Sequence, residues 1–481
     1  MAEPSDNMPS CPRCAELERR NAELERRNAE LERRNAELER RIVELEARIA
    51  QLEQLLEKAT RAKKRQAAPF SKGPPKTNPK RPGRKPGADY GTPAFRSAPP
   101  PKQIDEVHEA VLPMRCPHCG GAVRETHTAC QYQVEIPRRP IYRQFNVHVG
   151  QCTDCGQRLQ GRHGLQTSDA LGAAASQLGP DLQALIAQLN KDAGLSHGKI
   201  QRLMKALFDI QLSRSGSVQA MMRVARRCEP VYQGILRAMS RQSAVTPDET
   251  GWRVGGRLAW LHAFAAGRLT CYVIDRRRGV EVAERVLGSD YAGALIHDGW
   301  APYDRFWLAT HQQCLAHLLR RCAEMIEAAR SGAVRFPRQV KALLQDALGL
   351  RDRYQRGQVS HHGLAVARGR LERRRDRLLR WTRVDGANER LAKHLSNHRD
   401  QLFTFLYQPG LDATNYRGEQ AIRPAVVNRK VWGGNRTDAG AAAQSILMSV
   451  LRSCTQQGRD ALTFVSRLLC GQQPRLLLTP T

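Results

Sequence analysis

The most regular pattern of apolar and polar positions lies at the start of the chain. Residues 15–41 repeat the heptad AELERRN, and leucine recurs at every seventh position. Leucine at heptad position d with asparagine at position a (Asn21, Asn28 and Asn35) favours a parallel, two-stranded coiled coil in fixed register. The alternative, a single solvated charged helix, does not explain the unbroken leucine spacing. Residues 1–57 are therefore predicted to be a coiled coil that joins two copies of the chain.

Further along, residues 166–240 have the apolar spacing of helices. Two helical patterns, 181–192 and 197–211, are separated by the break Ala-Gly-Leu-Ser. A helix, a short glycine turn and a second helix entered at a serine cap resemble a helix-turn-helix, in which Lys199 and Arg202 would contact DNA. An ordinary helical hairpin gives the same pattern, so the hairpin stays open as the alternative.

After residue 243 the pattern changes to short strands. Residues 243–254, 256–267 and 267–279 predict three strands linked by hairpins, 281–288 a helix, and 293–300 a further strand. Three such strands, a helix and another strand are the opening of a ribonuclease-H-like fold. In that fold the ends of the first and fourth strands lie side by side, which would bring Asp248 close to Asp298.

Two neighbouring carboxylates at this place suit metal-dependent phosphoryl transfer. Asp248 and Asp298 can bridge a pair of divalent cations about 4 Å apart. Glu249 is the rival of Asp248, and strand alternation turns the two to opposite faces, so only one can point at Asp298. Glu419 offers a third carboxylate near the start of a later helix, for which Asn415 is a suitable N-cap.

Basic residues are predicted to contact DNA phosphates around these sites. Near Glu419 they are Arg417, Arg423, Arg429, Lys430 and Arg436. Residues 58–105 are rich in Lys, Arg, Pro and Gly and lack periodicity, which predicts a disordered basic linker. Its KRPGRKPG motif puts Arg81, Arg84 and Lys85 on an extended backbone that fits a narrow minor groove, or that serves equally well as a spacer touching phosphates.

The cysteines indicate metal. Cys116 and Cys119, and 33 residues later Cys152 and Cys155, form two Cys-x-x-Cys pairs separated by strand-like alternation. Two such pairs predict a four-thiolate structural zinc site within residues 106–165. Cys11 and Cys14 have no second pair, and are either a weak site shared across the dimer or two unpaired thiols. Cys314 and His317 have the spacing C-x-x-H, but a helix facing the core explains them better than a metal.

Composition points to a polyanionic partner. The 481 residues include 77 Lys and Arg against 47 Asp and Glu, a formal net charge of +30, which favours nucleic acid. No apolar run is long enough to span a membrane, and the first residues do not form a signal peptide. A cytoplasmic, nucleoid-associated protein is expected, in a reducing compartment where paired cysteines suggest zinc and not disulfides.

Together these motifs resemble the transposases of the insertion-sequence 66 family. The resemblance covers nearly the whole chain. It is carried by the leucine heptads, PKRPGRKPG, the CPHC and CTDC pairs, DETGWRV, HDGWAPYD, CLAHLLRR, and NYRGEQAIRP with NRKVWGG. It implies a DDE-type catalytic core in which Asp248, Asp298 and Glu419 bind Mg²⁺ or Mn²⁺. Gly418 and Trp300 differ from the residues expected at their positions.

The resemblance also implies a domain order and a reaction. The predicted fold class is multidomain α+β. A ribonuclease-H-like core over 241–314 and 406–460 is interrupted by a helical insertion over 315–405 and followed by a tail over 461–481. The expected activity is binding of the terminal inverted repeats, DNA strand cleavage and strand transfer into target DNA, with small accessory proteins as further partners. The alternatives are a zipper-dimerised DNA-binding regulator derived from a transposase and a structure-specific nuclease.

Overall fold

The chain divides into two units, Met1–Glu109 and Ala110–Thr481. The computed structural model describes residues 12–64, 98–134, 136, 139–172, 177–329 and 331–479. Cys11, the side chain of Cys14 and the linker residues Arg81, Arg84 and Lys85 therefore lie outside the described residues. Within the described ranges, no helix is both long and apolar enough to cross a membrane.

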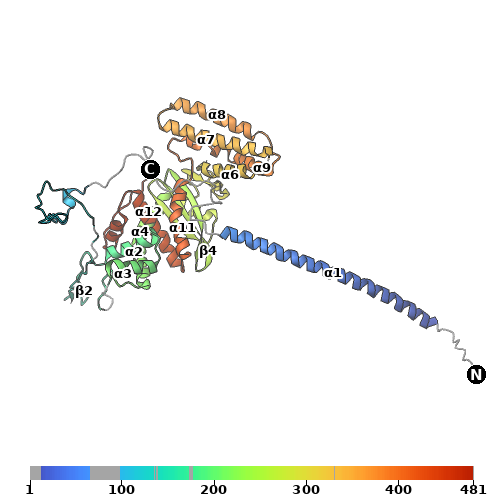
Figure 1. The fold of residues 1–481 in the computed structure, drawn as a ribbon, viewed down its shortest axis with the longest axis horizontal. Coiled ribbons are helices and arrows are strands. Elements are labelled where there is room, and N and C mark those ends of the chain that lie inside the picture. The colour runs from blue at the N-terminus through green and yellow to red at the C-terminus, as the bar shows by residue number, and fades with distance from the viewer. Residues whose placement is uncertain are drawn as a thin grey trace, which may run out of the picture. The chain divides into compact units, whose positions relative to one another are not determined.

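In the first unit, the heptad repeat forms one long helix, α1 (Pro12–Lys64), drawn in blue in Figure 1. Ala, Leu, Glu and Arg are strong helix formers, so the repeat favours a helix at nearly every position. The leucines at position d are all about half exposed, at 49–62% (Leu17, Leu24, Leu31, Leu38, Leu45 and Leu52). The helix continues to Lys64 and so takes in the start of the predicted linker. A short 3₁₀ turn, η2 (Pro101–Gln103), follows.

The second unit begins with the cysteine pairs, where the structure contains less strand than predicted. In the described part of this segment, the regular strands are β1 (Val149–Gln151) and β2 (Arg158–Gln160), which pair antiparallel. Among the described residues of the alternating segment 131–148, none belongs to a strand, which corrects the prediction there. The apolar residues Val134 and Tyr142 are each 84% exposed. Alternation alone does not make a strand when nothing covers its apolar face.

Next come α2 (Pro180–Lys191), α3 (His197–Phe208) and α4 (Arg214–Met239). The break predicted between the first two is a turn containing Gly194 at φ +71°. Ser196 is the N-cap of α3, and its side chain accepts a hydrogen bond from the Lys199 N–H. Ile186, Ile200 and Met204 are buried in a small core between these helices.

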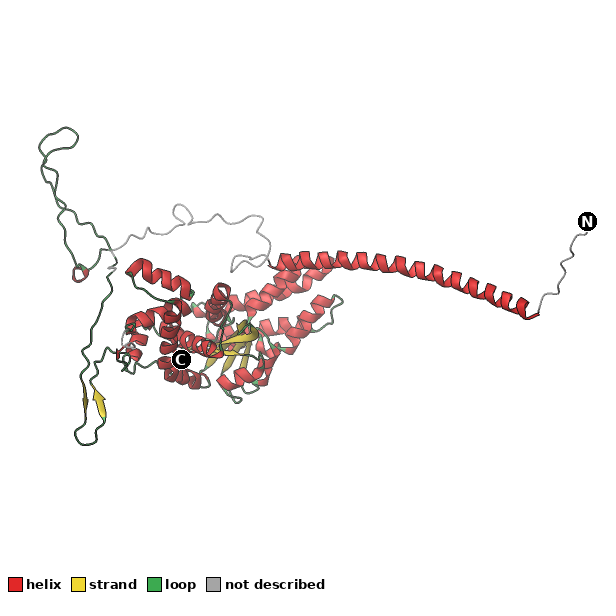
Figure 2. Cartoon of the chain, turned by 90° about the horizontal axis from the view of Figure 1, so that it is seen from below, coloured by secondary structure: helices red, strands yellow, loops and turns green. Residues whose placement is uncertain are grey.

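A mixed five-stranded sheet forms the centre of the unit, and Figure 2 shows it among helices. Its strands are β3 (Ala244–Val254), β4 (Arg257–Ala265), β5 (Thr270–Asp275), β6 (Ala294–His297) and β7 (Thr310–Gln313), in the order β5-β4-β3-β6-β7. The first three are antiparallel, while β6 runs parallel to β3 and β7 parallel to β6. Helix α5 (Val280–Leu287) connects β5 to β6, and η4 (Ala301–Arg305) lies between β6 and β7. This arrangement is compatible with a ribonuclease-H-like core.

Helices from the end of the chain complete this core: α11 (Tyr416–Trp432), α12 (Asp438–Gln456) and α13 (Ala461–Leu469). Three serines spaced four residues apart on α12, Ser445, Ser449 and Ser453, accept hydrogen bonds from alternate backbone N–H groups of β5. The helix thereby covers a sheet edge that would otherwise expose unpaired donors. The prediction of a C-terminal tail is corrected for its first part, since α13 buries Phe464 and Val465 and packs against α2.

Residues between β7 and α11 form the helical layer at the top of Figure 1. Its elements are α6 (Leu315–Ala328), η5 (Ser331–Val334), α7 (Arg335–Gln355), α8 (His361–Leu379), α9 (Gly386–Asn397), η6 (Arg399–Gln401) and α10 (Thr404–Tyr407). Leu344 and Leu391 are fully buried in its own apolar core, which also includes Ile296 of β6. The segment predicted as a helical insertion is thus helical, and it packs on the β6 side of the sheet.

Candidate active site

The strand register brings two of the predicted carboxylates to the same level of the sheet. Strand β3 pairs with β6 through Ala244 opposite Ala294 and Val245 opposite Leu295. Asp248 and Asp298 each stand four residues beyond the first of these pairs, so they lie at corresponding positions on adjacent parallel strands. The exposed Asp298 directly follows the end of β6, and its Oδ1 accepts a hydrogen bond from the Trp300 N–H at 3.0 Å.

Asp248 faces helix α11. A Cβ atom added to Gly418 of that helix would lie only 3.2 Å from the Cβ of Asp248. A larger residue at Gly418 would therefore push the helix away from the strand. Within the described part of the chain, Asp248 forms no ion pair, and its Oδ1 accepts the N–H of Glu249 at 2.9 Å.

Glu249 lies on the opposite face of β3, as strand alternation predicts. Its Oε1 accepts hydrogen bonds from Arg278 at 2.8 and 3.2 Å, and the Tyr303 hydroxyl donates to its Oε2 at 3.4 Å. The Arg278 guanidinium in turn lies 4.6 Å from the ring centre of Trp260 and 5.0 Å from that of Trp300. Glu249 is thus engaged by a cation that two indole rings hold in place.

Glu419 lies in the first turn of α11. Asn415 occupies the N-cap position, as predicted, but its side chain does not cap the helix. Instead, the Cys314 thiol donates to Asn415 Oδ1 at 3.2 Å, and the Asn415 N–H donates back to the Cys314 sulfur at 3.2 Å. Both residues are buried. The cysteine of the C-x-x-H motif therefore fixes the start of the helix that presents Glu419.

The histidine of the same motif and an arginine three residues later lie beside the Glu419 carboxylate. His317 Nε2 and Arg320 Nη2, both on α6, each lie 3.8 Å from Glu419 Oε1. The Glu419 side chain is 41% exposed, so these contacts are only partly shielded from water. In this arrangement the charge of Glu419 is balanced by groups of the chain itself.

The carboxylates share an electrostatic field. Burial, and then the charges of Glu249, Asp298 and Glu419, raise the pKa of Asp248 to about 7, against the lowering effect of the Glu249 N–H. Burial also raises the pKa of Glu249, despite its hydrogen bond with Arg278, and the charge of Asp298 adds to this. The negative charge of Asp298 therefore raises the pKa of both Asp248 and Glu249, although these two side chains lie on opposite faces of the strand.

This accumulation of negative charge is what a divalent cation would neutralise. Carboxylate oxygens are the donors that Mg²⁺ and Mn²⁺ prefer, so the donor set fits such ions. Among the described residues, however, no three His, Cys, Asp or Glu side chains are placed to hold one metal ion. Asp248, Asp298 and Glu419 are thus within electrostatic range of one another, but they do not form a closed coordination shell.

The four cysteines of the predicted zinc site do not form a metal-binding group either, among the residues that the structure describes. Each pair nevertheless has the same local fold. The Cys116 N–H donates to the Gly121 carbonyl, and the Gly120 N–H donates to the Cys116 carbonyl. The turn at Cys152 has the same two backbone hydrogen bonds. Backbone N–H groups within each turn lower the pKa of the first thiol, Cys116 or Cys152. Each turn therefore favours the thiolate that zinc requires.

The basic residues predicted to contact DNA fall into two groups. Arg417 pairs with Asp412 at 2.6 Å, and Arg429 donates to Thr250 Oγ1 at 2.9 Å and to the Gly251 carbonyl, so Arg429 ties α11 to β3. The others are exposed on α3, on α11 and in the loop after α11 (Lys199, Arg202, Arg423, Lys430 and Arg436).

Sequence reasoning missed Arg278 and Arg320. Arg278 is the last of three consecutive arginines and Arg320 the first of two, so no spacing distinguishes either from its neighbours. Only the fold selects Arg278 for Glu249 and Arg320 for Glu419. The C-x-x-H motif was a visible signal for Cys314 and His317, but its role depends on contacts with residues about 100 positions later.

A mixed sheet of this order, with carboxylates gathered where β3 and β6 lie side by side, is typical of enzymes that act on phosphodiester bonds. The family model described as transposase, IS66 family, matches residues 175–443, more than half of the chain. The chain belongs to the IS66 family of transposases, and so to a class of enzymes that modify DNA. The resemblance inferred from the motifs is thereby confirmed. No curated protein matches the sequence.

Proposed function

We propose that this protein cleaves DNA at the ends of its own element and joins the freed 3′ ends to target DNA. The observation that carries the proposal is the carboxylate cluster in which the pKa of Asp248 is raised to about 7 by burial and by neighbouring acids. Such perturbation by burial and like charges is characteristic of catalytic sites. Here it falls on the strand pair where the family assigns its acidic residues.

Asp248, Asp298 and Glu419 would hold Mg²⁺ or Mn²⁺. When bound, these ions would lower the pKa of the attacking water and stabilise the leaving oxygen. Asp248 of β3 and Asp298, directly after β6, stand the same number of residues beyond the paired positions, so the two strands would set their separation. Glu419 is positioned by the contacts of Asn415 with Cys314. Arg278 holds Glu249 on the opposite face, which leaves Asp248 as the acid directed at α11.

DNA would be bound by basic residues outside the acidic cluster. Lys199 and Arg202 are exposed along α3, with the spacing of one helical face, which supports the helix-turn-helix interpretation. The two cysteine turns would come together on one Zn²⁺, since a four-thiolate site is tetrahedral and closed. Such a module, together with the linker residues Arg81, Arg84 and Lys85, would contact the end of the element.

The half-exposed leucine seam of α1 supports self-association. A row of apolar side chains at every seventh position is stabilised by packing against a second helix. We therefore assign dimerisation to α1 of two copies of the chain. A dimer would allow both ends of the element to be held together. Small accessory proteins encoded with the element would be additional partners, and the complex would act at the nucleoid.

The test is cleavage of a labelled duplex containing the terminal repeat, in Mg²⁺, with a gel shift on the same DNA. The repeat is found as the inverted sequences that flank the gene. Asp298→Asn keeps the side-chain shape but removes a charge, so cleavage should fall by roughly three orders of magnitude or more. DNA binding should persist, because the phosphate contacts do not involve this carboxylate.

Two further variants test which of the other acidic residues are needed for cleavage. Glu419→Gln should behave like Asp298→Asn, whereas Glu249→Gln, on the opposite face, should cost far less. Full cleavage by Asp298→Asn would remove the catalytic assignment and leave a DNA-binding regulator. Equal loss from Glu249→Gln would reopen the choice between Glu249 and Asp248. A strand-transfer assay separates a transposase from a nuclease of the same fold, because the nuclease would cleave without joining.

A further inference from the structure

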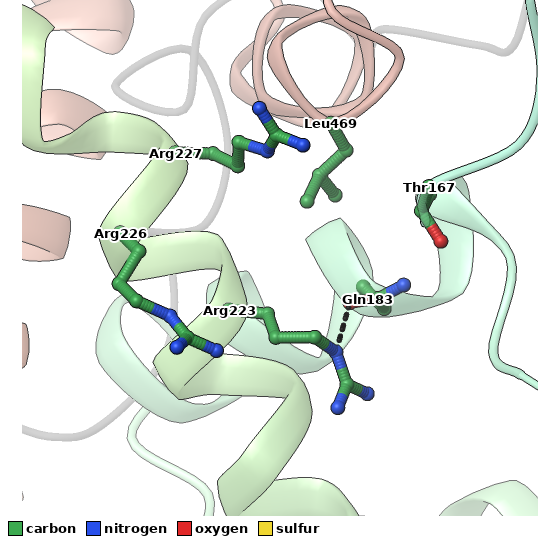
Figure 3. A pocket seen from close by; sticks show the side chains of 6 residues that line it. All are labelled: Thr167, Gln183, Arg223, Arg226, Arg227 and Leu469. Atoms are coloured by element: carbon green, nitrogen blue, oxygen red, sulfur yellow. Dashed lines mark hydrogen bonds between the residues drawn. The ribbon is translucent and has the colours of Figure 1, made fainter. Parts of the chain in front are cut away.

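A second candidate site lies between the helical region and the last helix. It is an open pocket of about 380 Å³. Figure 3 shows its lining residues, which come from the segment before α2, from α2, α4 and α13 (Thr167, Gln183, Arg223, Arg226, Arg227 and Leu469). None of them belongs to the carboxylate cluster, and no sequence motif indicated them.

The pocket concentrates positive charge. Arg223, Arg226 and Arg227 are spaced i, i+3 and i+4 on α4, so their side chains project from one face of the helix, where like charges repel. The Arg223 Nε donates to Gln183 Oε1 at 3.2 Å, the dashed line in Figure 3. Within the described ranges, none of the three guanidinium groups forms an ion pair with a carboxylate. Repulsion without local compensation favours binding of an anion.

The neighbourhood adds a further cation. Arg143, in the segment before β1, is close enough to Cys470 to lower its pKa, although burial and Asp181 together raise it. Cys470 directly follows Leu469 of the pocket. The surroundings of the pocket therefore hold Asp181 as well as Arg143, and the positive charge of the pocket itself comes from the three arginines of α4.

The chemistry of the lining identifies the class of anion. The guanidinium fork matches the oxygens of phosphate. The described residues that line the pocket include no aromatic side chain on which a base could stack, which argues against a nucleotide. Residues 223–227 extend about 6 Å along α4, which covers one or two phosphates of a strand that rises about 3.4 Å per nucleotide.

We propose that this arginine pocket binds backbone phosphates of the double-stranded DNA at the element end. The inference rests on the proposed function, because it takes element DNA as the partner. It extends the DNA surface from the exposed face of α3 to α4.

The experiment measures binding alone, by gel shift of the labelled terminal-repeat duplex in EDTA at several NaCl concentrations. The pocket variant is Arg226→Gln/Arg227→Gln, which changes two exposed residues. The matched control, Arg237→Gln/Arg241→Gln, removes the same charge from exposed positions at and beyond the end of α4. Thermal melts of both variants check folding, and Arg226→Gln alone replaces the double variant if that one unfolds.

The pocket variant should lower the slope of log K against log[NaCl] by about one to two, and weaken binding by roughly 10- to 100-fold at 0.1 M salt. The control should change both much less. An unchanged slope, or equal loss from pocket variant and control, would overturn the proposal. So would pocket-dependent binding of inorganic phosphate or ATP with normal DNA binding. Since EDTA prevents metal-dependent cleavage, these outcomes do not depend on whether Asp298 is catalytic.

Discussion

Replacing Asp248 by asparagine should stabilise the metal-free protein and at the same time abolish DNA cleavage. The folded-state pKa of Asp248 is raised from 3.8 to about 7, chiefly by burial and then by neighbouring acids. Between these two pH values the unfolded chain releases a proton that the folded chain retains. The free energy of unfolding therefore falls as the pH rises from about 4 to about 7. Asparagine carries no charge at any of these pH values, so the free energy of unfolding of the variant does not fall in this way.

The size of the effect follows from the two pKa values. At about 1.4 kcal/mol for each pH unit between 3.8 and 7, the penalty above pH 7 is about 4 kcal/mol. Because part of this shift comes from the charges of neighbouring acids, a gain of about 2 to 4 kcal/mol is expected at pH 8, and much less at pH 4. Asparagine can still accept the Glu249 N–H that Asp248 accepts at 2.9 Å, so the substitution breaks no other contact.

Urea unfolding in EDTA at pH 4, 6 and 8 measures this difference. Asp275→Asn is the matched control, with the opposite sign. Burial raises the pKa of Asp275, but hydrogen bonds from Arg277 and Arg285 outweigh it and leave this pKa lowered. Asp275→Asn should therefore destabilise the protein at all three pH values, because the unfolded-state pKa of 3.8 and the lowered folded-state pKa both lie below pH 4.

Adding Mg²⁺ in the same experiment should stabilise the wild-type protein and not Asp248→Asn, because a ligand bound only by the folded state raises its stability. An Asp248→Asn variant that is less stable than wild type at pH 8 without metal would contradict the raised pKa of Asp248. A stability difference that does not change with pH would contradict it as well.

Three further outcomes are expected. Removing residues 1–57 should lower the mass measured by sedimentation at micromolar concentration, and an unchanged mass would place the main dimer contact elsewhere. Cys152→Ser should lose about one zinc per chain in elemental analysis and increase proteolysis of residues 110–160 while the core stays folded; unchanged zinc content would remove the site. Cys314→Ala should slow end cleavage by about tenfold, because two sulfur contacts at the start of α11 are lost, and Cys314→Ser should restore most of it. Cys322→Ala, in the insertion core, should lower stability without slowing cleavage by folded protein, and equal slowing by both alanine variants would contradict the role given to Cys314.

The sequence alone determined the elements whose signal is local. The heptads predicted α1, because a seven-residue repeat of strong helix formers favours a helix through local propensity, without any tertiary contact. Serine, glycine and apolar spacing predicted α2, the turn and α3. Short apolar runs and alternation predicted the strands from β3 to β6. Alternation also predicted that Asp248 and Glu249 lie on opposite faces, because successive side chains of a strand point to opposite faces of its sheet.

Only the tertiary structure decided what depends on burial and on distant contacts. Residues 131–148 alternate like a strand, yet the described residues of this range form none, because no layer covers their apolar side chains. Residues 461–469 resemble a tail yet form a core helix, because α2 provides the surface on which they are buried. Arg429 has the charge of a DNA ligand, but its hydrogen bonds with Thr250 and Gly251 assign it to the core. The pKa of Asp248 and the convergence of three arginines on one pocket likewise arise from packing, since desolvation and charge proximity exist only when separate segments meet.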